Sequence, residues 1–129
     1  MLPFTIQFQS GKAVYEQVLL AVKRALTVGQ LKAGDRFPSV RVLSQELRIN
    51  PNTAHKIVSA LADEGLLIIQ PGVGTVVAQI KPPTPQQKQE LIEQEIERLV
   101  VEARFASLDL EDLLPAIKQT WQRLTKERR

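Results

Sequence analysis

Residues 38–65 have the sequence PSVRVLSQELRINPNTAHKIVSALADEG, which predicts two consecutive helices joined by a short turn. Ser39 is suited to cap the first helix, because its hydroxyl can accept a hydrogen bond from an amide of the first turn. Asn50 and Pro51 are suited to begin the second, since asparagine caps well and proline needs no amide proton at the first helical position. The turn between them is Arg48-Ile49-Asn50, in which Ile49 supplies an apolar plug. Two helices joined in this way are typical of a helix-turn-helix.

A helix precedes this pair and a β-hairpin follows it. Apolar residues at helical spacing predict the earlier helix, which Gly29 ends: Tyr15, Val18, Leu19, Val22 and Leu26. Two apolar segments, 66–70 and 75–78, flank the turn Pro71-Gly72-Val73-Gly74 and predict a hairpin. The expected fold class is mainly α with a small β-hairpin wing, a winged helix-turn-helix over residues 1–81. Tyr15 is expected to be a packing residue.

The remainder of the chain, residues 82–129, is expected to be a helical pair. Pro82, Pro83 and Pro85 lie in a polar segment, residues 81–87, which predicts a linker. Asp109 is a suitable cap for the second helix, Pro115 is expected to bend it or delay its start, and residues 126–129 are expected to fray. Two apolar stripes form a predicted dimerisation surface, for which we select Ile96, Leu99, Val100, Leu113, Ile117, Trp121 and Leu124. Trp121 continues such a stripe and is therefore expected in a dimer core and not in a cofactor site.

Charge is distributed unevenly between these two parts. The chain has a net charge of +3, but residues 1–81 hold nine Lys/Arg against five Asp/Glu, and residues 82–129 hold eight against nine. A basic N-terminal part is a modest indication of a polyanionic partner. Glu93, Glu95 and Glu97 are interpreted as a solvated helix face.

Several classes of function find no support in the sequence. There is no cysteine and only one histidine, His55, so neither a disulfide nor a metal site is expected. The Gly72-Val73-Gly74 segment lies in a hairpin and not between a strand and a helix, so it is not a dinucleotide-binding loop. With no nucleophile–base pair evident, we expect no enzyme and no cofactor. We also expect no signal peptide and no membrane span, and hence a cytoplasmic protein.

The first turn of the helix after Pro51 carries the chemistry of nucleic-acid recognition. It presents Asn52, Thr53, His55 and Lys56, all of which can donate hydrogen bonds. Its N-terminus also offers free amides and partial positive charge, which suit phosphate. Gly72 and Gly74 would let the hairpin backbone approach a phosphate or a minor groove closely, although turn geometry alone also accounts for them.

Residues 13–77 resemble the DNA-binding domain of the GntR family of bacterial regulators. The segments that carry the resemblance are 14–18 (VYEQV), 29–41 (GQLKAGDRFPSVR), 43–44 (LS), 47–53 (LRINPNT), 61–66 (LADEGL) and 71–77 (PGVGTVV). The resemblance implies that Arg41 contacts DNA, that Asn50, Asn52, Thr53 and His55 are recognition-helix contacts, and that Gly72 lies at a wing tip in the minor groove. His55 and Lys56 stand where many members have arginine, so base preference is expected to differ. Arg36-Phe37 replaces a more common aliphatic pair.

The short C-terminal part is similar to that of the YtrA-type subfamily, in which a helical pair is used for dimerisation and which is often associated with transporter operons. The resemblance therefore implies a homodimer that binds an inverted repeat of double-stranded DNA, with repression as the favoured output. We select Ser39, Arg41, Asn50, Pro51, Asn52, Thr53, His55, Lys56, Gly72 and Gly74 as the DNA-binding residues.

Bland interpretations remain open beside these. Without the resemblance Arg41 is an ordinary surface arginine, and Asn50 is a helix cap whether or not it touches DNA. An alternative function is a winged-helix protein-interaction module with no DNA role, although the polar first turn after Pro51 does not favour it. The sequence identifies no operator, regulated gene or small-molecule effector.

Overall fold

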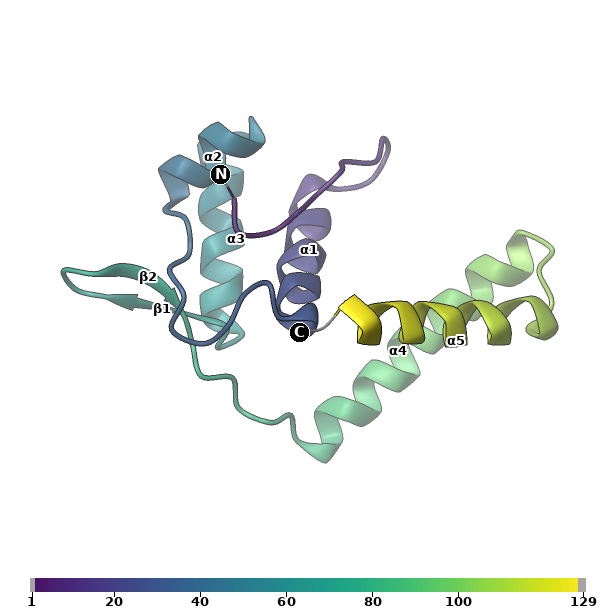
Figure 1. Cartoon of the computed structure of the whole chain (residues 1–129). Helices are drawn as coiled ribbons and strands as arrows, with labels where there is room; N and C mark the ends of the chain where they lie inside the picture. The colour runs from purple at the N-terminus through teal and green to yellow at the C-terminus, as the bar shows by residue number, and fades with distance from the viewer. Residues whose placement is uncertain (1, 128–129) are drawn as a thin grey trace. The chain divides into compact units, whose positions relative to one another are not determined.

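The computed structural model describes residues 2–127 and divides the chain into two compact units, one ending at Ile80 and the other comprising Lys81–Glu127. The first unit contains α1 (Val14–Val28), α2 (Val40–Leu47), α3 (Pro51–Asp63), β1 (Leu67–Gln70) and β2 (Gly74–Val77). The second contains α4 (Pro85–Phe105) and α5 (Leu110–Glu127). Figure 1 shows three helices followed by a hairpin, and then the helical pair, which is the predicted order.

The core of the first unit is formed by the apolar stripes of its three helices. Val18, Leu43, Ile57 and Leu61 are fully buried there, each on the stripe that the sequence predicted. The N-terminal segment adds Phe4, whose ring stacks on that of Phe37 with the centroids 6.0 Å apart. The predicted core is thus confirmed and is extended by a contact between residues 33 positions apart.

The hairpin pairs β1 with β2 in antiparallel register, from Leu67 opposite Val77 to Gln70 opposite Gly74. The connecting turn is closed by the Val73 amide, which donates to the Gln70 carbonyl over 3.0 Å. Pro71 at its second position and Gly72, with a φ of 78°, at its third are the residues that a type II turn requires. Both strands begin and end within one residue of the predicted segments.

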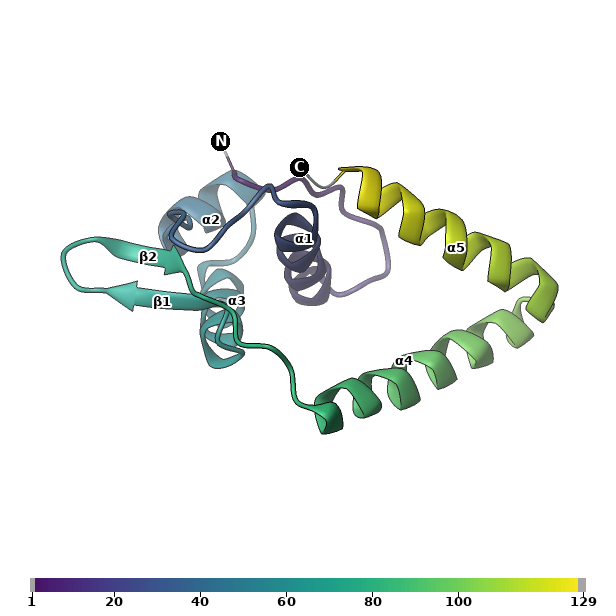
Figure 2. The same cartoon turned by 60° about the horizontal axis from the view of Figure 1, so that its bottom comes forward.

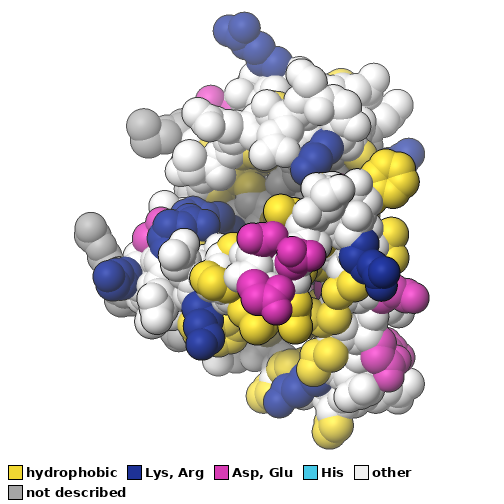
Figure 3. Space-filling view, turned by 90° about the vertical axis from the view of Figure 1, so that its right-hand side faces the viewer, with side chains coloured by type: hydrophobic (Ala, Val, Ile, Leu, Met, Phe, Trp, Pro, Cys, Tyr) yellow, Lys and Arg dark blue, Asp and Glu magenta, His cyan; other side chains and the backbone are white. Residues whose placement is uncertain are grey.

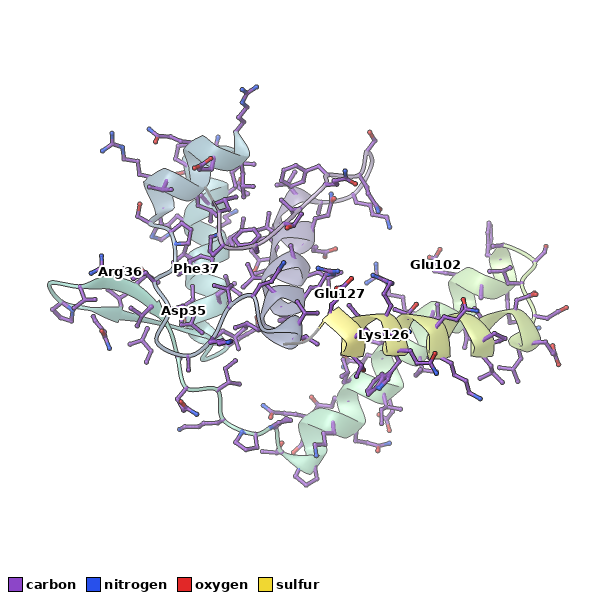
Figure 4. The ribbon with its side chains drawn as sticks, viewed as in Figure 1. Asp35, Arg36, Phe37, Glu102, Lys126 and Glu127 are labelled. Atoms are coloured by element: carbon purple, nitrogen blue, oxygen red, sulfur yellow. The ribbon has the colours of Figure 1, made fainter. Side chains whose placement is uncertain are left out.

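A third extended segment lies beside β2, which the sequence did not indicate. Residues 34–37 connect α1 to α2 and run along the hairpin, as the labelled Asp35, Arg36 and Phe37 show in Figure 4. The Phe37 amide donates to the Thr75 carbonyl, and the Val77 amide donates to the Asp35 carbonyl. These bonds anchor the base of the hairpin to the connection that leads into α2.

Three local predictions for the C-terminal part are wrong in detail. The linker is shorter than predicted because α4 begins at Pro85, where Thr84 and Gln87 form a capping box. Pro115 does not delay α5, which begins at Leu110 and contains it, since one missing amide costs only one intrahelical hydrogen bond. Lys126 and Glu127 are helical and not frayed, while residues 128–129 of the same prediction lie outside the described residues.

The apolar stripes of α4 and α5 remain largely exposed to solvent. Ala103 is the one buried hydrophobic side chain among the described residues of this unit, and Leu113 and Leu124 are half-buried. Ile96 is 50% exposed and Trp121 is 75% exposed. The space-filling view in Figure 3 shows hydrophobic side chains at the surface with acidic side chains among them. No helix in residues 2–127 is both long and apolar enough to cross a membrane.

Candidate nucleic-acid interface

The helix-turn-helix is built as the sequence predicts, with three residues between α2 and α3. Ser39 caps α2 by accepting a hydrogen bond from the Val42 amide over 3.2 Å. The Asn50 side chain caps α3 by accepting from the Asn52 amide over 2.8 Å, and Pro51 occupies the first turn. Both caps fix the starting direction of their helices, and so they determine where the following polar side chains lie.

The turn itself is held by a hydrogen bond that sequence reasoning missed. Ser44 is a buried polar residue on α2, and its hydroxyl donates to the Ile49 carbonyl over 2.8 Å. The Ile49 amide in turn donates to the Ser44 carbonyl over 3.1 Å, so the two residues bond in both directions. Ile49 is half-buried against the core, as predicted for a plug. A serine among the apolar residues of an otherwise amphipathic helix was the available signal.

Arg48 ends α2 in the left-handed conformation, with a φ of 55° and a ψ of 49°. A side chain bearing a Cβ is disfavoured there, and glycine is the usual residue. The Arg48 amide donates to the Ser44 carbonyl, so Ser44 receives the chain at the start of the turn as well as at its end. The angle between α2 and α3 therefore depends on a short, tightly bonded segment.

The exposed side of this unit presents polar and basic groups. Arg41 on α2 is exposed, and so are Asn52, His55 and Lys56 on α3, while Thr53 is half-buried. The packing of α2 against α3 places Arg41 and the first turn of α3 in one folded unit. A shallow depression beside this turn is lined by Thr53, His55 and Lys56, together with Tyr15 of α1.

Gly72 and Gly74 lie elsewhere, at the far end of the hairpin, which projects away from the three helices in two views (Figures 1 and 2). Their φ angles are 78° and 106°, which L side chains rarely adopt, so turn geometry alone requires glycine at both. A Cβ at either position would meet no atom within 4 Å, so the protein itself does not occupy the space around the tip. The whole segment from Gly65 to Ile80 carries no charged residue.

An N-terminal helix bundle, a three-residue helix-turn-helix and a β-hairpin with an adjacent extended segment define a winged helix-turn-helix protein. Residues 14–77 match the family model "Bacterial regulatory proteins, gntR family". The chain is 32% identical to the HTH-type transcriptional repressor YtrA of Bacillus subtilis over 112 residues, which cover 86% of each protein. The chain belongs to the GntR family, and it is therefore a DNA-binding transcription regulator and not an enzyme.

Two further comparisons extend over both units. The uncharacterized HTH-type transcriptional regulator YhcF of B. subtilis is 30% identical over 87% of this chain and 93% of its own. A crystal structure of a transcriptional antiterminator from Listeria monocytogenes matches with a TM-score of 0.79, at 24% identity, covering 94% of this chain and 91% of the other. The similarity thus includes the helical pair, which agrees with the resemblance to the YtrA-type subfamily.

Proposed function

We propose that this regulator binds an inverted-repeat operator as a homodimer and represses transcription. The observation that carries the proposal is the first turn of α3, which is capped by Asn50 and leaves Asn52, His55 and Lys56 exposed next to the N-terminal amides of the helix. In a helix-turn-helix the N-terminal residues of the second helix contact base edges in the major groove. Donors dominate this turn, whereas a protein-interaction surface would be expected to be apolar or acidic, so the alternative of a DNA-independent module is not favoured.

Each selected residue has a distinct role in this proposal. Arg41, with five guanidinium donors in a fixed fork, reads a base edge or clamps a phosphate from α2. Asn52 and His55 face the bases, while Lys56 adds charge next to the backbone. Ser39, Asn50, Pro51 and Thr53 set the helix starts and supply further polar contacts.

The hairpin contributes a second contact. Its tip is uncharged and narrow, and the open space around Gly72 and Gly74 lets the backbone approach the minor groove closely. Because it offers no ammonium or guanidinium group, this contact is expected to depend little on salt.

The homodimer is supported by the two open apolar faces of the helical pair. Ile96, Leu99 and Val100 form one on α4, and Ile117 and Trp121 form the other on α5, flanked by the half-buried Leu113 and Leu124. Monomeric soluble proteins rarely leave such contiguous apolar stripes exposed. A symmetric partner would cover both faces and would relate the two DNA-binding units by a two-fold axis, as an inverted repeat requires.

Repression is proposed by analogy with YtrA, which is named a repressor, and regulation of its own operon and of a transporter operon is proposed from the subfamily resemblance. A cytoplasmic location accords with a protein that must reach DNA. No small-molecule effector is proposed.

The test is fluorescence anisotropy with a duplex that the protein enriches from fragments of its own genome, measured beside a scrambled duplex across a salt series. Replacing Arg41 by alanine should weaken binding to the enriched duplex by about 1–3 kcal/mol if its base contact is bidentate. The matched control is Arg104→Ala, which removes an exposed arginine from the end of α4. Equal losses in both variants, or a protein that enriches no sequence, would contradict the proposed reading surface.

A further inference from the structure

A shallow open depression runs along the exposed side of α3 beside the beginning of α1. Tyr15 forms its α1 wall, and the α3 residues along it include Thr53, Lys56, Ser59 and Asp63. These side chains span the helix from its first turn to its end, because successive residues rise about 1.5 Å along the axis. The depression therefore extends from the proposed reading surface toward the flank of the unit.

Tyr15 divides between two environments. Its ring is half-buried and packs against the core of the first unit, as its place on the apolar stripe predicts. Its hydroxyl has no hydrogen-bond partner within residues 2–127, although it belongs to a side chain that lines the depression. A tyrosine hydroxyl usually finds a partner when the ring is buried. Here the partner must come from outside the unit.

Charge along the depression favours an anion at one end. Lys56 and His55 lie near its N-terminal end, next to the free amides of the first turn of α3. Asp63 lies seven residues beyond Lys56, about 10 Å along the helix, which is about one Debye length at 0.1 M salt. Repulsion from Asp63 therefore acts weakly on an anion held between Tyr15 and Lys56.

We propose that the Tyr15 hydroxyl donates a hydrogen bond to a backbone phosphate of the bound DNA, the same phosphate that the Lys56 ammonium neutralises. This inference rests on the proposed function, and it adds a contact that the sequence assigned to packing. A phosphate contact carries no base information but fixes how a protein is oriented on the duplex. Because the ring of Tyr15 is anchored in the core, its hydroxyl is a rigid reference point for seating α3 in the groove.

The discriminating variant is Tyr15→Phe, which removes one oxygen and keeps the ring. With the enriched duplex, and equally with the scrambled one, binding should weaken about three- to tenfold, the range for one neutral hydrogen bond. The salt dependence should not change, since no charge is removed. Lys56→Gln should instead reduce the slope of log K against log salt by about 0.9. The double variant should lose less than the product of the two single losses, because both groups hold one phosphate.

A control and a direct readout separate this contact from a structural effect. Thr27→Val removes a hydroxyl from the opposite end of α1, where it donates to the Lys23 carbonyl, and it should leave DNA binding unchanged. Tyr15 is the one tyrosine in the chain, so a protein labelled with 13C at the tyrosine Cζ gives a single NMR signal. That signal should shift when either duplex is added.

The outcomes distinguish this inference from the proposal beneath it. If Tyr15→Phe binds both duplexes as tightly as the unchanged protein, or if its midpoint of thermal unfolding falls along with its affinity, the phosphate contact is overturned. Selective binding to an enriched duplex would still stand in either case. A protein that binds no duplex would remove the proposed function and this contact together.

Discussion

Replacing Arg48 by glycine should stabilise the first unit, although arginine forms part of the basic surface. Arg48 adopts the left-handed conformation at the end of α2, and its amide remains bonded to the Ser44 carbonyl there. A residue with a Cβ in this conformation costs about 1–2 kcal/mol. Glycine removes that strain, but its greater freedom in the unfolded chain costs about 0.4–1 kcal/mol. The expected net gain in the free energy of unfolding is about 0.5–1 kcal/mol.

The matched control for this prediction is Arg48→Ala, which removes the same charge and keeps the Cβ. Urea and thermal unfolding should be followed by circular dichroism at one fixed protein concentration, because a dimer unfolds at a midpoint that depends on concentration. The glycine variant should melt above the alanine variant by about 2–6 °C, from the usual relation for a domain of this size. A glycine variant no more stable than the alanine variant would refute the claim that backbone strain is stored in this turn.

Two further substitutions test the turn and the proposed dimer. Ser44→Ala should destabilise the first unit by about 1–3 kcal/mol in urea unfolding, because the Ile49 carbonyl loses its hydroxyl donor in a half-buried site; an unchanged midpoint would mean that water replaces the hydroxyl at no cost. Ile96→Glu should convert the dimer to a monomer in sedimentation, whereas Val101→Glu, about 140° around α4 from it, should not; equal behaviour would place the interface elsewhere.

Local signals account for most of what could be predicted. Ser39, Asn50 and Pro51 mark helix starts through bonds within a few residues of themselves, and the structure confirms all three. Apolar periodicity gave the buried faces of α1, α2 and α3, since only one side of each helix meets the core. The hairpin followed from Pro71-Gly72, which match the dihedral angles of one turn type.

Contacts between distant residues could not be predicted in the same way. Residues 34–37 pair with β2 across about forty positions, and nothing in their own pattern distinguishes a strand from a turn. Phe4 stacks on Phe37 for reasons that exist only in the folded unit. The start of α4 was obscured because proline is frequent both in linkers and at the first helical position, so Pro85 has two meanings until Thr84 is seen to cap it.

The proposed site divides along the same line. The exposure of Asn52, His55 and Lys56 could be predicted because they lie off the apolar stripe of α3. Tyr15 could not be selected, since periodicity placed its ring correctly in the core and said nothing about where its hydroxyl ends. Residues whose two ends serve different purposes are those that a pattern of apolar positions describes incompletely.

The open faces of the helical pair bear on DNA binding as well as on assembly. One DNA-binding unit offers few phosphate contacts, and each contributes modestly at physiological salt. Linking two units through a dimer makes the second binding event intramolecular, which can raise overall affinity by about a hundredfold or more without any new contact. It follows that Ile96→Glu, which alters no residue near α3, should weaken operator binding at least as much as Arg41→Ala does, while leaving binding to a single half-site unchanged. If the two half-sites were bound independently, loss of the dimer would have no such effect, and the C-terminal unit would need another purpose.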